Sequence, residues 1–77
     1  MSVSAYIFIE CEHGKSMTVA DKVGRIASVK EAHAVTGSYD VIAFVTASNF
    51  KVLGDVVITK IQGVAGVKKT ITNVVVE

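Results

Sequence analysis

The chain has a single cysteine and no long apolar run, and both absences limit what the protein can be. Cys11 alone cannot form a disulfide within the chain, and it leaves any metal site short of thiolates. The longest apolar run, residues 41–45, is far shorter than the roughly 20 residues that cross a bilayer. We therefore expect a soluble, cytoplasmic protein with no signal peptide and no membrane partner.

An excess of charge of one sign is also missing. Eight lysines and arginines nearly balance seven acidic residues, which gives a net charge of +1. A protein that neutralises several phosphates needs a clustered basic face, and the lysines here are scattered among acids. We expect no direct binding to nucleic acid.

Motifs for catalysis or cofactor binding are absent too. The sequence contains no glycine-rich dinucleotide loop, no Walker lysine loop and no Gly-x-Ser-x-Gly elbow. Residues 10–13 (Glu-Cys-Glu-His) carry metal-ligating atoms but lack the paired spacing of a zinc site. His33 is a lone imidazole with no partner nearby in the sequence. We expect no catalytic residue, no metal and no cofactor.

What the chain does contain is one unit repeated at an offset of 38 residues. The aligned pairs include Val3/Val41, Ala5/Ala43, Ile7/Val45, Val19/Val57, Val23/Ile61, Ile26/Val64 and Val29/Val67. Strand-like and helix-like stretches follow the same order in both halves. The repeat predicts a β-α-β-β-α-β order within a single domain that spans residues 1–77.

The first half is expected to be strand, helix, strand. Residues 3–10 form an extended segment that is apolar on both faces, and residues 29–36 form a half-polar strand. Between them, Val19, Val23 and Ile26 recur at helical spacing. The Thr18-x-x-Asp21 spacing predicts a side-chain cap at the start of this helix.

The second half repeats the pattern. Residues 36–40 are a turn into the most apolar strand, residues 41–47, and Ser48 and Asn49 offer a helix cap. The helix that follows has its expected buried positions at Phe50, Leu53, Val57 and Ile61, with Gly54 inside it. Gly63 and Gly66 end this helix, and residues 67–76 form the last strand.

Right-handed crossovers place both helices on one face of a four-stranded antiparallel sheet. The other face is expected to carry Tyr6 and Phe8, opposed by Ile42 and Phe44. A chain of this length buries only roughly 60% of its unfolded surface, so its own core is small. Each of the four side chains contributes roughly 1.5–3 kcal/mol if a partner buries it fully. We predict a homodimer through this face.

Two polar groups are candidates for binding a small molecule. Asp40 leads into an apolar strand and suits a ligand ammonium, while Gly37 lets a ligand carboxylate approach the backbone. Thr70 and Thr72 share one strand face and offer hydroxyl groups. An ordinary hairpin turn and ordinary strand threonines explain the same residues equally well.

The hairpin segment Val35-Thr-Gly-Ser-Tyr-Asp40 and the ending Gly66-Val-Lys-Lys-Thr-Ile-Thr72 resemble the effector-binding (RAM) domain of the Lrp/AsnC transcriptional regulators. The resemblance covers essentially the whole chain. It implies a ferredoxin-like α+β fold, dimers joined through their sheets, and rings of dimers with amino-acid effectors bound between them. The effector-binding residues that it implies are Thr36, Gly37, Tyr39, Asp40, Thr70 and Thr72.

The chain departs from the family pattern because it shows no helix-turn-helix domain before the first strand. The resemblance therefore implies a stand-alone module that senses an amino acid and oligomerises, and that acts on transcription through a full-length Lrp/AsnC regulator. Ser38 stands where relatives often carry an acidic or amide residue, which bears on effector choice.

Two alternatives remain. One is a small ferredoxin-like enzyme, a cofactor-free oxygenase or isomerase, with His33 or His13 in a cavity between sheet and helices. The other is an ACT-like amino-acid-binding regulatory domain, which shares the strand order but pairs its sheets side by side. We expect a protein that is not an enzyme.

Overall fold

The structure is a computed structural model that describes residues 2–77. Its strands are β1 (Val3–Cys11), β2 (Val29–Ala34), β3 (Val41–Ala47) and β4 (Val67–Val74). Its helical segments are α1 (Ser16–Gly24), α2 (Phe50–Asp55) and the π-helix η1 (Val56–Ile61), which continues α2. The strands form one antiparallel sheet in the order β2-β3-β1-β4. This order confirms the predicted ferredoxin-like α+β fold.

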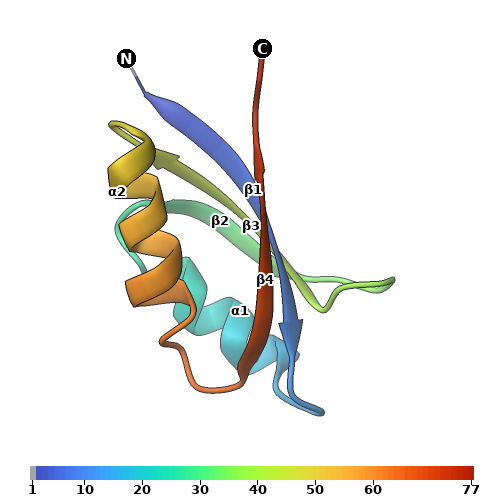
Figure 1. Ribbon diagram of the computed structural model, residues 1–77. Coiled ribbons are helices and arrows are strands. Elements are labelled where there is room, and N and C mark those ends of the chain that lie inside the picture. The colour runs from blue at the N-terminus through green and yellow to red at the C-terminus, as the bar shows by residue number, and fades with distance from the viewer. Residues whose placement is uncertain (1) are drawn as a thin grey trace.

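Both helices lie on one face of the sheet, and the two ends of the chain lie at the same end of it (Figure 1). The helices cover the alternate strand positions that the pleat turns toward them. Ala5, Ile7 and Ile9 of β1 and their neighbours in β3 are fully buried there. Within residues 2–77 no helix is long and apolar enough to span a membrane.

The internal repeat identifies the core. The repeated pairs Ala5/Ala43, Ile7/Val45, Val19/Val57 and Val23/Ile61 are buried in both halves. Each half therefore supplies equivalent side chains to one shared core. When two copies of a strand–helix–strand unit pack together, equivalent positions of both copies are buried, so similar residues recur at a fixed offset.

The start of α1 corrects one prediction. Thr18 and Asp21 were expected to cap the helix, but the helix begins at Ser16, and the position before it, Lys15, makes no side-chain cap. The first helical hydrogen bond runs from the amide of Val19 to the carbonyl of Lys15 at 2.8 Å, so Thr18 already lies inside the first turn. Asp21 instead forms an ion pair with Arg25 at 3.1 Å on the exposed side.

Three further boundaries are shorter than the sequence indicated. The helix α1 ends at Gly24, so Ile26 packs half-buried against the core from the following turn. The strand β2 ends at Ala34 rather than residue 36. The strand β4 ends at Val74 rather than residue 76, although the amide of Val75 still donates a hydrogen bond of 2.8 Å to the carbonyl of Ser4 in β1.

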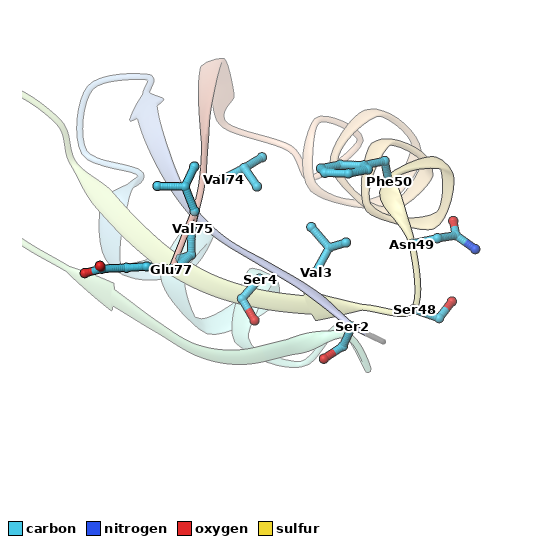
Figure 2. Close-up of a pocket in the computed structure, with 10 residues that line it drawn as sticks. Ser2, Val3, Ser4, Ser48, Asn49, Phe50, Val74, Val75 and Glu77 are labelled. Carbon is cyan, nitrogen blue, oxygen red and sulfur yellow. The ribbon is translucent and has the colours of Figure 1, made fainter.

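The cap predicted at Asn49 is confirmed, since its side-chain oxygen accepts a hydrogen bond from the amide of Val52 at 2.9 Å. Leu53, Val57 and Ile61 are buried as expected. Phe50 was expected in the same buried stripe, but 68% of it is exposed. Its ring lies at the edge of the helix layer, where it lines an open hollow together with Val3 and Val74 (Figure 2).

The face of the sheet that no helix covers has the predicted side chains. Tyr6 lies opposite Phe44, Phe8 opposite Ile42, and Ile71 of β4 extends the row beside Phe8. We call these five residues the open face. Tyr6 is 47% exposed and the other four are half-buried, so the residues proposed as a dimer interface are accessible in the single chain.

Candidate functional site

The hairpin loop between β2 and β3 holds four of the six predicted effector residues. A hydrogen bond of 2.9 Å from the amide of Val35 to the carbonyl of Asp40 closes the loop. Gly37 lies at its tip with a φ of +117°, where a side chain is strained even though the surrounding space is open. Thr36 and Gly37 are exposed, so this loop presents backbone groups to solvent.

Asp40 joins the hairpin to the end of β1. One carboxylate oxygen accepts a hydrogen bond from the amide of Cys11 at 2.8 Å, and the amide of Asp40 donates to the carbonyl of Ile9 at 3.0 Å. The sequence predicted that this carboxylate needs a hydrogen-bond donor and that a ligand ammonium would serve. The chain itself supplies one donor, and among residues 2–77 no hydrogen bond to the second oxygen, Oδ1, is found.

The contact with Asp40 also affects the only cysteine. Burial, and secondarily the negative charge of Asp40, raises the pKa of the Cys11 thiol above its ordinary value. The thiol therefore stays protonated at neutral pH and is a poor nucleophile or metal ligand. No cluster of three metal-ligating side chains occurs among the residues that the structure describes.

Tyr39 connects the hairpin with the open face. Its ring lies 5.5 Å from the ring of Phe8, centroid to centroid, in a tilted arrangement. The loop residues 36–40 are therefore in contact with Phe8 through Tyr39. The predicted effector loop and the predicted dimer interface share this contact.

The two threonines lie on the other side of the sheet. Thr70 pairs with Ile9 and Thr72 with Ile7, so both face the helix layer on the edge strand β4. The side-chain amide of Gln62, at the end of η1, donates a hydrogen bond of 2.8 Å to the hydroxyl of Thr70. The sequence analysis missed Gln62. Its only signal was its place directly before the helix-ending Gly63.

One chain does not bring the six predicted residues together. The strand β1 lies between β3, which carries the hairpin, and β4, which carries the threonines. Tyr39 is on the open-face side, whereas Thr70 and Thr72 are on the helix side. A site that uses both groups therefore requires residues from two chains.

The edge of the open face carries a polar pair that the sequence analysis did not expect. His33 and Glu31 of β2 are hydrogen-bonded at 2.8 Å, so His33 does have a partner. Residues two apart on a strand lie on the same face of the sheet, so the side chains of Glu31 and His33 are adjacent. With Tyr6, Ile42 and Phe44 they line a hollow of about 230 Å³.

A larger hollow, about 590 Å³, lies at the end of the sheet where both termini are found (Figure 2). Its walls are the start of β1, the turn before α2 and the last residues of the chain, with Phe50 and Val3 as apolar walls. None of the six predicted effector residues lines it. It is therefore separate from the hairpin and from the threonine pair.

The fold is a small ferredoxin-like α+β domain, and the comparisons with known proteins identify its family. The Lrp/AsnC ligand-binding domain matches residues 4–77. An uncharacterised HTH-type transcriptional regulator of Pyrococcus horikoshii is 35% identical over 77 residues, which are 96% of this chain and 51% of the relative. The chain belongs to the Lrp/AsnC ligand-binding domain family.

Solved structures agree. A protein of Thermus thermophilus has a TM-score of 0.91 at 27% identity, with 97% of this chain and 94% of that chain covered. AsnC of E. coli has a TM-score of 0.90 at 26% identity, with 97% and 51% covered. A Neisseria meningitidis transcriptional regulator in complex with L-methionine shares the fold, with a TM-score of 0.85 at 17% identity and 97% and 50% covered.

The chain spans about half the length of the HTH-type regulator that it matches. The matched half is the ligand-binding domain of a transcriptional regulator family. The HTH-type regulator therefore combines this domain with further residues, whereas the Thermus protein is covered over 94% of its length.

Proposed function

We propose that this chain is a small-molecule-sensing and oligomerisation module that acts in transcriptional regulation of amino-acid metabolism. The observation that carries the proposal is the open face in a chain of the Lrp/AsnC ligand-binding family. Aromatic and branched side chains cover that face, and in one chain they remain in contact with water. A contiguous apolar patch of this kind on a protein surface marks a site of interaction with a partner.

The open face supports a homodimer with sheet packed on sheet. Full burial of a large apolar side chain stabilises by roughly 1.5–3 kcal/mol before the costs of association. Phe8, Ile42 and Phe44 are already half-buried, so their contribution lies toward the lower end of that range. Because a two-fold interface buries every residue twice, even the lower value gives a substantial driving force.

The effector site is proposed between two dimers, with the hairpin of one chain facing β4 of another. Asp40 has one carboxylate oxygen held by Cys11 and directs its charge to a ligand ammonium. Gly37 and Thr36 offer backbone and hydroxyl groups, and Tyr39 closes one side of the site. Thr70 and Thr72 supply hydroxyl groups from the neighbouring chain. An amino acid fits this set, and the L-methionine bound by the Neisseria regulator agrees with that class of ligand.

These 77 residues are not proposed to contact DNA themselves. A net charge of +1 gives them no basic face for phosphates. The Thermus protein, matched over 94% of its length, is an example of a solved chain of similar extent. We infer that this cytoplasmic module assembles with a full-length Lrp/AsnC relative and that assembly carries the effector signal to DNA.

The enzyme alternative finds no support in the core. It required His33 or His13 in a cavity between the sheet and the helices. His33 lies on the opposite side, beside the open face, and buried apolar side chains fill the space under the helices. A regulatory module without catalytic residues fits this arrangement better.

The test is to measure mass by light scattering and the melting temperature of the purified chain with each amino acid in turn. A ligand at about 100 times its dissociation constant stabilises the assembly by about 2.7 kcal/mol, which raises the melting temperature. Asp40→Asn keeps an acceptor for the Cys11 amide but removes the charge, so it should abolish the response. A panel that changes neither mass nor melting temperature in folded wild-type protein would refute the effector site.

A further inference from the structure

The α2–η1 helix carries, beside its buried stripe, two large apolar side chains that the chain leaves in solvent. Phe50 is 68% exposed and Ile58 is 67% exposed. They are eight residues apart, and Gly54 lies midway between them. Residues four apart lie on one side of a helix. We call these three residues the helix stripe.

The π-helical turns reduce the sideways drift of the stripe. Four residues slightly exceed one turn of an α-helix, so an α-helical stripe drifts sideways. The turns of η1 are wider, with hydrogen bonds from residue i to i+5, and each residue there rotates the chain by less. Ile58 therefore lies closer to the line of Phe50 than it would in an α-helix, and the ring of Phe50 projects sideways from the first turn of α2 (Figure 2).

Gly54 has no explanation within a single chain. Its φ is not positive, so the backbone does not require glycine. An added Cβ would meet nothing within 4 Å, so packing does not require glycine either. Glycine inside a helix costs about 1 kcal/mol relative to alanine. What a missing side chain does allow, on an open helix side, is close approach by another backbone.

The charges beside the stripe indicate what approaches. Lys51 and Asp55 are exposed, four residues apart, and each directly follows a residue of the stripe. If a second identical helix lies antiparallel across a two-fold axis at Gly54, Phe50 faces Ile58 of the second copy. On the flank, Lys51 then lies beside Asp55 of the second copy, and the reverse pair forms by symmetry. Shape, apolar contact and charge are all self-complementary.

We propose that the helix stripe Phe50–Gly54–Ile58 docks against the same stripe of a second copy of this chain, with the two helices antiparallel around Gly54. This interface lies on the opposite layer from the open face, so one chain can use both. Two different two-fold interfaces join dimers into larger assemblies. The inference goes beyond the proposed function and does not depend on effector binding.

The test is sedimentation velocity on the full chain over a range of concentrations. Wild-type protein should form species larger than a dimer. Gly54→Leu should weaken the helix-mediated step by roughly tenfold or more, as expected for a residue at an interface centre, and leave the open-face dimer. Met17→Ala, which removes an exposed apolar side chain from α1, should change nothing. A Gly54→Leu variant with wild-type mass distribution would overturn the proposal.

Two further variants separate docking from a role in the fold. Gly54→Ala should raise the melting temperature of the dissociated chain, because alanine is the better helix former, and yet weaken assembly. Lys51→Glu should weaken assembly, and the addition of Asp55→Lys should restore it. Restoration would confirm the antiparallel pairing, while failure of the double variant to recover would refute it. Wild-type protein that forms the open-face dimer and responds to an effector, but shows no assembly through the helix stripe, refutes this inference alone.

Discussion

Replacing Phe44 with alanine is expected to raise the dissociation constant of the open-face dimer by about a hundredfold. Phe44 is half-buried in the single chain and contacts the ring of Tyr6 at a centroid distance of 4.8 Å. Burying the remaining part of the ring contributes about 1.5 kcal/mol, the low end for a large apolar side chain. The two-fold interface contains the ring twice, so about 3 kcal/mol is lost, and 1.4 kcal/mol corresponds to a tenfold change.

The assay is sedimentation equilibrium of wild-type and variant chains over the same concentration series. Met17→Ala serves as the matched control, because Met17 is an exposed apolar residue on the helix layer. The substitution also removes the ring pair with Tyr6, which is worth about 0.5–1.5 kcal/mol within one chain. Circular dichroism melting at a concentration where the wild type has dissociated measures that part separately.

The outcome is decisive in both directions. If the dissociation constant of the Phe44→Ala dimer equals that of the wild-type dimer, the open face is not the interface and the reasoning fails. If wild-type protein is a monomer throughout the series, the proposed assembly fails with it. A dissociation constant that rises while the single-chain melting temperature falls only slightly is the predicted result.

Three other predictions follow from particular contacts. Asp40→Ala removes the acceptor of the Cys11 amide and should destabilise the fold by about 1–3 kcal/mol in urea unfolding, whereas Asp40→Asn should cost less; equal loss in both would show that the charge matters more than the hydrogen bond. Asn49→Ala removes the cap of α2 and should cost about 1 kcal/mol, with Asn49→Asp close to wild type; an unchanged urea midpoint would contradict the cap. Because the pKa of Cys11 is raised in the folded chain, its contribution is complete at neutral pH and is lost as the pH rises above its ordinary value of 9.0. Cys11→Ala should therefore lose less stability than wild type between neutral and strongly alkaline pH, and parallel curves would refute this.

Much of the fold could be predicted from local pattern. The repeat at a 38-residue offset and the alternation in residues 3–10 and 41–47 predicted the element order and both faces of the sheet, and the structure confirms them. The cap at Asn49 was also predictable, because a side-chain acceptor before a helix acts on amides only three residues away. These features depend on neighbours in the sequence.

Element ends were less predictable because they depend on distant partners. The strand β4 ends at Val74 although β1 continues to Val3, and α1 starts two residues before Thr18, directly after the turn that contains Gly14 at a φ of +76°. Phe50 matched the apolar spacing of the core, yet it is exposed and lines the open hollow beside Val3 and Val74. Helical spacing alone does not show whether another element covers a side chain.

The candidate site divides in the same way. The sequence by itself determined which residues carry polar chemistry, such as Asp40 and the threonines of β4, and which face of the sheet would remain apolar. Only the tertiary structure decided that β1 separates those polar groups and that Gln62 contacts Thr70. It also decided that the Asp40 carboxylate accepts a hydrogen bond from the backbone amide of Cys11. The physical reason is that side-chain chemistry and periodicity are local properties, whereas distance between strands is set by hydrogen-bonded pairing of segments far apart in the chain.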